Sequence, residues 1–190
     1  AQFFKENIVA LKNNKTSTEV HVINEADGRV IRKIELPLSR YEFITTPSQY
    51  LHLYDRKRQV LYLLDVDNYI KPLVESFNNV KFFKWNGRGR MLYGNDFEIW
   101  EYDLTSRQKS ILRRISDRIY DVAWQQNTNI IYSTEKGIFA ISFDSKGNQS
   151  KTRLYDLRDI KKIETDLSGE LLFFQADIGS QKGLYKLFLR

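Results

Sequence analysis

The sequence contains no cysteine, only two histidines and no long run of apolar residues. Without thiols the chain can form neither disulfides nor thiolate metal sites, and cysteine-based catalysis is excluded. Any histidine-rich metal site or Ser-His-Asp triad would have to use His21 or His52. No apolar stretch approaches the roughly 20 residues that a membrane-spanning helix needs, so no transmembrane segment is expected.

Basic side chains are only moderately in excess over acidic ones. Thirty basic and 24 acidic side chains among 190 residues give a net charge of +6. This balance permits attraction to nucleic acid or to an anionic surface but does not require it. The opening residues lack the basic region and the long apolar stretch of a signal peptide. They also lack an initiator methionine, so we expect a chain that is processed or trimmed at its front.

Two stretches of the sequence share one pattern, 39 residues apart. The segments WNGRGRMLYG (85–94) and WQQNTNIIYS (124–133) each begin with a tryptophan that is followed eight residues later by a tyrosine. Val80, Tyr120 and Ile160 each open a short alternating run, and they are spaced by 40 residues. A fixed period of this length is typical of proteins built from structural repeats.

Each period divides into four short strands. In the clearest unit these are RIYDVAWQ, NIIYSTE, GIFAISFD and KTRLYDL, separated by segments rich in Gly, Asn, Asp and Ser. No long segment has the i, i+3, i+4 apolar pattern of a helix. Four strands per period predict an all-β propeller of four-stranded antiparallel blades. The expected units of this single domain are residues 1–40, 41–79, 80–119, 120–159 and 160–190, which make four blades and a partial fifth.

The repeats resemble those of a known family. The segment IWEYDLTSRQKSILRRI (99–115) resembles the third and fourth strands of WD40 or TolB-like propeller repeats, and DVAWQQNTNIIYST (121–134) resembles their first two strands. The Gly-His pair and the Trp-Asp dipeptide of classical WD40 repeats are missing, so the resemblance implies the architecture and not a subfamily. Repeats of this kind resemble bacterial envelope or surface propellers more than eukaryotic WD40 hubs, which implies an envelope or surface location.

The last expected unit ends after its third strand, which leaves two alternatives for the ring. One is a five-bladed ring closed by 190 residues. The other, which we favour, is the C-terminal part of a ring of six to eight blades. An incomplete ring would expose a sheet face and favour self-association.

Trp85 and Trp124 occupy equivalent corners of two expected blades. Equivalence across repeats favours packing between blades, and stacking on sugars or bases is the alternative. A second set of equivalent residues ends the third strands. We expect each of these to cap the following turn through backbone amides, with a ring of cation ligands as the alternative. The set consists of Asn24, Asp65, Asp103 and Asp144.

Basic side chains gather in three segments, 54–59, 86–90 and 111–118. Together they would form one positive patch able to bind phosphates, whereas the acidic residues that interrupt them favour an ordinary solvated surface. The candidate binding residues are Arg56, Lys57, Arg58, Arg88, Arg90, Arg113 and Arg114.

Catalytic motifs are missing, because no segment matches a nucleophile elbow, a P-loop or a dinucleotide-binding fingerprint. His21 and His52 lie in strand-like runs and are expected to be surface or core histidines. We therefore predict a non-catalytic binding scaffold for a protein partner, with no cofactor or metal. The alternatives are a binder of nucleic acid or anionic glycan through basic loops and exposed aromatics, and a propeller enzyme with a central-funnel site.

Overall fold

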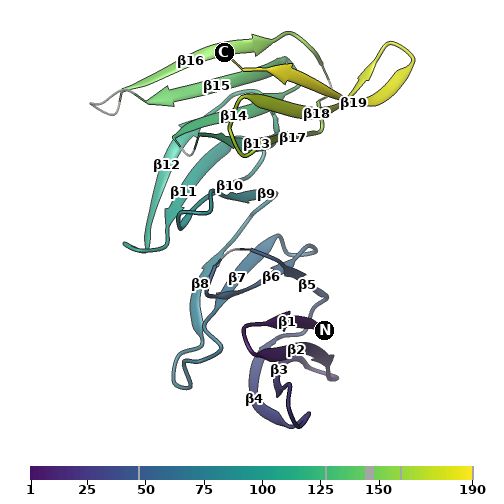
Figure 1. The fold of residues 1–190 in the computed structure, drawn as a ribbon, viewed down its shortest axis with the longest axis vertical. Coiled ribbons are helices and arrows are strands. Elements are labelled where there is room, and N and C mark those ends of the chain that lie inside the picture. The colour runs from purple at the N-terminus through teal and green to yellow at the C-terminus, as the bar shows by residue number, and fades with distance from the viewer. Residues whose placement is uncertain (47, 127, 144–147, 159, 190) are drawn as a thin grey trace. The chain divides into compact units, whose positions relative to one another are not determined.

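The computed structural model describes residues 1–190 except 47, 127, 144–147, 159 and 190. Regular structure in the described residues is entirely β, and it forms four four-stranded antiparallel sheets and one three-stranded sheet (Figure 1). In each sheet the strands follow one another in chain order. The five sheets begin at Gln2, Tyr41, Phe82, Ile119 and Lys162, so the predicted period near forty residues is confirmed.

The chain divides into two compact units, Ala1–Val80 and Lys81–Arg190. The first holds two sheets and the second holds three. The predicted grouping of all repeats in one domain stays a prediction. The first unit contains blade 1, with β1 (Gln2–Phe4), β2 (Asn7–Asn13), β3 (Ser17–Asn24) and β4 (Val30–Pro37), and blade 2, with β5 (Tyr41–Ile44), β6 (Leu51–Asp55), β7 (Val60–Leu64) and β8 (Leu73–Phe77).

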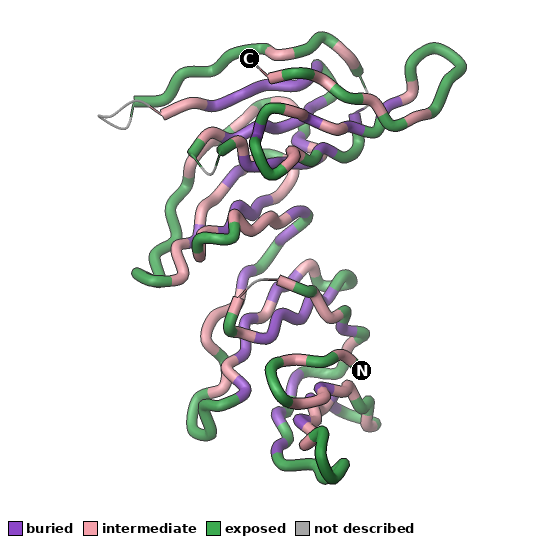
Figure 2. The backbone as a smooth tube through the Cα atoms, viewed as in Figure 1, coloured by how far each residue is buried: buried purple, intermediate pink, exposed green. Residues whose placement is uncertain are grey.

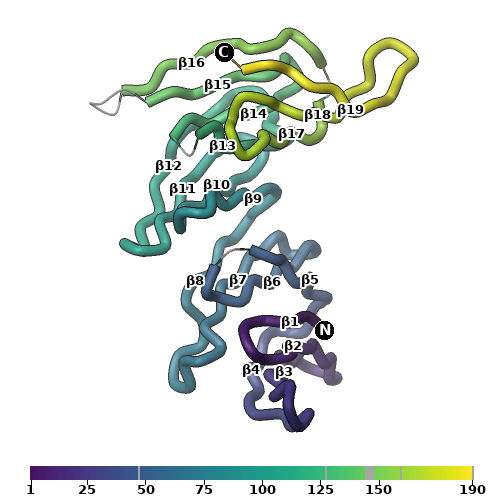
Figure 3. The backbone as a smooth tube through the Cα atoms, in the orientation of Figure 1, coloured from purple at the N-terminus to yellow at the C-terminus, as the bar shows by residue number. Residues whose placement is uncertain are grey.

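The second unit contains the remaining three sheets, and the chain runs through them sheet after sheet (Figure 3). Blade 3 has β9 (Phe82–Trp85), β10 (Arg90–Gly94), β11 (Glu98–Asp103) and β12 (Gln108–Arg114). Blade 4 has β13 (Ile119–Gln125), β14 (Asn129–Thr134), β15 (Gly137–Phe143) and β16 (Gln149–Tyr155). Blade 5 has β17 (Lys162–Thr165), β18 (Leu171–Ile178) and β19 (Gln181–Phe188).

The strands form because branched and aromatic side chains alternate along them and bury one or both faces of each sheet. Figure 2 shows this as buried segments in the middle strands and exposed turns between them. In the first unit, Val20 and Val22 of β3 pack with Leu51 and Leu53 of β6 in one apolar cluster. Blades 1 and 2 therefore share one apolar core, as expected of stacked repeats.

The first strands of blades 3, 4 and 5 lie side by side, since β13 contacts both β9 and β17. Two hydrogen bonds from equivalent corners join these sheets. The indole Nε1 of Trp124 donates to the backbone oxygen of Lys84 at 3.0 Å, and Oγ1 of Thr165 donates to the backbone oxygen of Trp124 at 2.5 Å. Trp124 is only 7% exposed, so the predicted packing role between blades is confirmed for this residue.

The residues that end the third strands cap their turns, as predicted. Oδ1 of Asn24 accepts from the backbone N–H of Ala26 at 2.8 Å. Oδ1 of Asp65 accepts from the N–H of Asp67 at 3.1 Å. Oδ1 of Asp103 accepts from the N–H groups of two following residues at 2.9 and 2.8 Å. The equivalent residue of blade 4, Asp144, lies outside the described residues.

Candidate functional site

Blade 5 buries only one face of its sheet. Its inner face places Leu172 and Phe174 in an apolar cluster with Ile131 and Ile138 of blade 4. Its opposite face carries the alternate residues of the three strands, because successive side chains of a strand point to opposite sides. The pairing registers align these alternate residues across the sheet as Lys162–Gln175–Leu184 and Glu164–Phe173–Lys186.

We call this second surface the open face of blade 5, defined by Lys162, Phe173, Lys182, Leu184, Lys186 and Phe188. Leu184 is 74% exposed and Phe188 is 66% exposed, which is unusual for large apolar side chains placed together on one sheet. Lysines stand beside both of them along β19. The open face thus combines accessible apolar area with positive charge.

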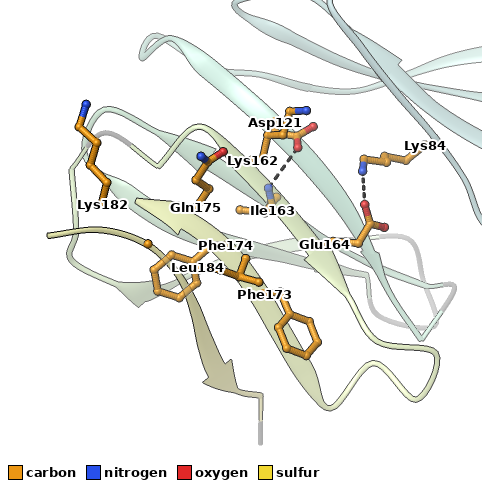
Figure 4. Close-up of a pocket in the computed structure, with 11 residues that line it drawn as sticks. Lys84, Asp121, Lys162, Ile163, Glu164, Phe173, Phe174, Gln175, Lys182 and Leu184 are labelled. Carbon is orange, nitrogen blue, oxygen red and sulfur yellow. Dashed lines mark hydrogen bonds and ion pairs between the residues drawn. The ribbon is translucent and has the colours of Figure 1, made fainter. Parts of the chain in front are cut away.

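A cavity of about 590 Å³ lies at the side of the open face nearest the first strands (Figure 4). Lys162 and Glu164 of β17, Phe173 of β18 and Leu184 of β19 line it, together with Lys84 and Asp121 of the neighbouring blades. Figure 4 shows the Lys84 ammonium directed at the Glu164 carboxylate, with which it forms an ion pair.

Asp121 is the buried acid of this cavity, at 8% exposure. Its Oδ1 accepts from the N–H of Val122 at 2.9 Å, and its Oδ2 accepts from the N–H of Ile163 in blade 5 at 3.1 Å. Burial raises the pKa of the Asp121 carboxyl, and the charge of Lys84 opposes that shift. Both carboxylate oxygens have backbone donors, so Asp121 acts chiefly to join blade 4 to blade 5.

The first predicted basic segment lies in the turn between β6 and β7. The Arg56 guanidinium forms two hydrogen bonds of 2.8 Å with the Glu42 carboxylate, and this contact lowers the pKa of Glu42. Arg58 contacts the carboxylate of buried Asp55 at 3.3 Å and donates to the backbone oxygen of Leu38 at 3.1 Å. Both arginines are therefore held by acceptors of their own unit.

A second cavity of about 590 Å³ lies beside this turn. Three cationic residues, Arg40, Lys57 and Arg58, line it together with the polar residues Asn13 and Ser39 and the apolar Leu38. We call it the basic pocket. Of the seven predicted cations, Lys57 and Arg58 are the two that the structure places at this cavity.

Four further predicted cations lie on blade 3, at two opposite ends of its sheet: Arg88, Arg90, Arg113 and Arg114. Arg90 pairs in register with Asp103, at the last residue of β11. Arg113 and Arg114 pair with Ile99 and Glu98, at the beginning of β11. The structure therefore does not bring these two groups together.

Acceptors and rings surround the blade 3 cations. Arg90 forms an ion pair with Glu101, and its guanidinium lies 5.2 Å from the centroid of the Trp124 ring. Arg114 contacts Glu98 at 3.1 Å. The hydrogen bond that the Trp100 indole donates to the Glu98 carboxylate is the largest cause that lowers the pKa of Glu98, and the hydrogen bond from Arg114 lowers this pKa further. Nη1 of Arg113 donates to the side chain of Gln149 at 3.2 Å, and Arg88 lies in the exposed turn before β10.

The two histidines occupy strands, as expected. His52 of β6 is 1% exposed, and burial lowers the pKa of its imidazole to about 4. His21 of β3 lies with its Nε2 2.6 Å from a carboxylate oxygen of Glu19. Across the part of the chain that the structure describes, no three His, Asp or Glu side chains are grouped as metal ligands would be. The same residues include no helix that is long and apolar enough to cross a membrane.

The sequence predicts a third strand at the end of the last unit, where β19 lies, but it does not reveal the open face. The open face is marked in the sequence by the alternate residues of β19. These residues, Lys182, Leu184, Lys186 and Phe188, place two cations and two apolar side chains on one side of the strand. The pattern alone does not tell which side of the sheet a neighbouring blade covers. That information comes from packing.

No family model matches the chain, and no curated protein sequence matches it. Solved structures do. KlAtg21, in complex with the coiled coil of AgAtg16, superposes with a TM-score of 0.63 at 13% identity, over 97% of this chain and 64% of that one. Hsv2 of Kluyveromyces lactis gives 0.58 at 10% identity, over 93% and 61%. TolB of Acinetobacter baumannii gives 0.54 at 18% identity, over 97% and 51%.

These similarities concern the fold. The chain spans less than two thirds of the length of each of these three proteins. Together with the strand order and the period of the sheets, they establish the β-propeller architecture that the resemblance to WD40 and TolB-like repeats implied, with four complete blades and a partial fifth.

Proposed function

We propose that the chain is a non-catalytic binding scaffold and that the open face of blade 5 is its surface for a protein partner. The observation that carries this proposal is the joint exposure of Leu184 and Phe188 on one face of a regular sheet, beside a cavity of about 590 Å³. Apolar anchors near a pocket, bordered by polar and charged groups, are the usual composition of a protein interface.

The similarity to KlAtg21 supports this proposal in general terms, because that propeller is seen in complex with a coiled coil. It supplies an example of the fold used to bind another protein. The particular surface is argued from this chain alone. Three lysines would border the apolar contact: Lys162, Lys182 and Lys186. Their positive charge would speed association with an acidic partner and fix its orientation.

Replacing Leu184 by glutamate is expected to weaken partner binding at least tenfold, which corresponds to about 1.4 kcal/mol. The change places a charge at the centre of the apolar contact without disturbing the buried face of β19. The measurement is affinity purification of the tagged chain from its source cells, followed by calorimetric titration of the purified partner against wild-type and variant chains.

Ile70→Glu is the matched control, since Ile70 is 97% exposed and lies in the first unit. It should bind the same partner with unchanged affinity. Equal binding by the Leu184→Glu variant and the wild type would show that the partner uses another surface.

The basic pocket favours a second candidate function, the binding of an anionic ligand such as a nucleic acid or a sulfated glycan. Three cations around one cavity provide the multiple charge contacts that phosphate or sulfate groups need. This candidate retains Lys57 and Arg58 from the patch that the sequence predicts.

Heparin and single-stranded DNA serve as probes of this candidate. We expect affinity that falls steeply with ionic strength, and we expect Lys57→Glu to weaken binding several-fold and to lower the slope of log K against log salt by at least about 1. Lys71→Glu is the control, because Lys71 is exposed in the same unit and does not line the pocket. A uniform loss in both variants would mean only diffuse attraction to a basic surface.

A further inference from the structure

The basic pocket lies between blades 1 and 2, at the ends of their strands. Asn13 ends β2, residues 38–40 form the connection from β4 to β5, and Lys57 and Arg58 belong to the turn between β6 and β7. Its walls thus come from three segments that are distant in the sequence and that belong to one compact unit. The pocket is therefore formed by the packing of two four-stranded blades.

Two buried polar side chains hold the walls of the basic pocket, and both are 0% exposed. The hydroxyl of Thr18 accepts from the backbone N–H of Ser39 at 3.2 Å and donates to Oδ1 of Asn13 at 2.9 Å. The amide nitrogen of Asn13 is then left to donate to a ligand. The carboxylate of Asp55 accepts from the backbone N–H of Arg58 at 3.0 Å and contacts its guanidinium at 3.3 Å. These contacts fix the walls before a ligand arrives.

The cations of the basic pocket have an excess of charge over their acceptors. The Arg58 guanidinium contacts Asp55 and donates to the backbone oxygen of Leu38 at 3.1 Å, which uses two of the five N–H donors of an arginine. Within the described residues Arg40 and Lys57 form no ion pair, and both are exposed. Three cations and one carboxylate leave an excess of two positive charges.

This excess of charge matches a phosphate monoester. Such a group carries a charge of about −1.5 to −2 at pH 7 and presents three acceptor oxygens, whereas a sulfate ester or a nucleic-acid phosphodiester carries about −1. An arginine fork can bind two of these oxygens at once, and a lysine ammonium contacts an oxygen as a point charge. The charge of the pocket therefore favours the monoester over the other anions.

The exposure of the basic pocket indicates that its ligand belongs to a larger molecule. The volume of about 590 Å³ is that of a small-ligand site, but such sites usually enclose most of their ligand. Here every lining residue except Ser39 is exposed. Leu38, at 42% exposure, adds an apolar wall beside the cations. A phosphorylated side chain with an apolar neighbour in the same chain suits both parts of this surface.

We propose that the basic pocket binds a phosphorylated serine or threonine of a protein partner, with an apolar residue of that partner against Leu38. Arg40, Lys57 and Arg58 hold the phosphate, and the Asn13 amide donates to it. Phosphorylation of the partner thereby creates the contact, because the unmodified hydroxyl offers no charge to these cations. The inference rests on the second candidate function, the binding of an anion in the basic pocket, and names its ligand.

Synthetic ligands test both the charge of the bound group and the molecule that carries it. The probe is an acetylated seven-residue peptide with one phosphoserine between two leucines and with glycines at both ends. Matched peptides carry serine, glutamate or O-sulfoserine at the same position, and the sulfate keeps the shape of the phosphate while lowering its charge. Glucose 6-phosphate presents a phosphate monoester on a small molecule, and phosphatidylcholine vesicles with one tenth phosphatidic acid present it on a membrane.

Calorimetric titration of the whole chain measures the affinities, and a ¹⁵N-detected titration locates the contact. We expect saturable binding of the phosphoserine peptide, about tenfold or more tighter than any other ligand of the set, with amide shifts centred on the pocket. Arg40→Gln and Lys57→Gln should each weaken it about fivefold or more, because each removes one charge contact. Lys71→Gln is the matched control, since it removes an exposed cation of the same unit outside the pocket, and it should leave the affinity unchanged.

Equal affinity for the phosphoserine and O-sulfoserine peptides would overturn the inference, because the charge of the ligand would then not be selected. Glucose 6-phosphate binding as tightly as the peptide would assign the pocket to a small molecule, and vesicle binding that Lys57→Gln weakens would assign it to a membrane. If the phosphoserine peptide fails while Lys57→Glu still weakens binding of heparin and single-stranded DNA, the inference is wrong and the second candidate function stands. If Lys57→Glu has no effect on those two probes either, both are wrong.

Discussion

Lowering the pH from about 7 to about 4 should destabilise the Ala1–Val80 unit by roughly 3 kcal/mol through His52 alone. His52 is buried in β6, and this burial lowers the pKa of its imidazole to about 4, against about 6.5 in an unfolded chain. Between these two values the unfolded state binds a proton that the folded state does not. Stability is therefore fully present above about pH 6.5 and falls as the pH drops toward 4.

The measurement is urea unfolding at pH values between 7 and 4, followed through the NMR signals of β6, because the three tryptophans of the chain all lie in the second unit. His52→Leu removes the titrating group and should flatten the dependence between pH 6.5 and 5. Ile70→Ala, a change at a 97% exposed residue of the same unit that removes no titrating group, is the control and should leave the slope of the wild type unchanged. A His52→Leu variant that keeps that slope would assign the effect to other groups.

Replacing Gly137 by alanine should cost the second unit about 3 kcal/mol or more. Gly137 opens β15 with φ at +136°, a conformation that L side chains rarely adopt. A Cβ atom there would lie 2.3 Å from the backbone oxygen of Tyr155, so either the turn or the pairing of β15 with β16 must shift. The variant combines backbone strain with a clash against main chain, which a side-chain rotation does not relieve.

Gly179→Ala is the matched comparison in the same unit. Gly179 has φ at +62°, and a Cβ atom there would meet no atom within 4 Å. Strain alone should cost about 1 kcal/mol at this position. Urea unfolding followed by tryptophan fluorescence measures both variants. If Gly137→Ala lowers the free energy of unfolding no more than Gly179→Ala does, the backbone of β15 and β16 can shift at this position without cost.

The features that could be predicted from the sequence are those set by short stretches of chain. The short apolar run Ile130-Ile131-Tyr132 between polar neighbours indicates a strand buried on both faces, and β14 is buried almost throughout. Asp103 before Thr105 and Ser106 predicts a capped turn, because the side chain needs only the amides next along the chain. Because the pattern recurs about every forty residues, a strand or turn recognised in one blade predicts the equivalent strand or turn in the others.

The features that escaped prediction depend on register and on packing between blades. Arg90 and Arg114 look alike as basic residues near turns, yet the pairing of β10, β11 and β12 places them at opposite ends of one sheet. The partner of Arg90, Glu101, belongs to another strand and carries no marker in the sequence. The open face of blade 5 was missed for the same reason, since burial of one side of β18 is decided by blade 4.

The links between the first strands have a consequence for how such a chain can diverge. Trp124 and Thr165 both donate to a backbone oxygen of the preceding blade, and the acceptor in each case is independent of the side chain it belongs to. In blades 4 and 5, one side-chain donor thus joins the sheet to the preceding sheet, and the side chain of the residue that supplies the acceptor can vary. Duplicated repeats can in this way drift to very different sequences, exchange an indole for a hydroxyl, and still stack in the same order.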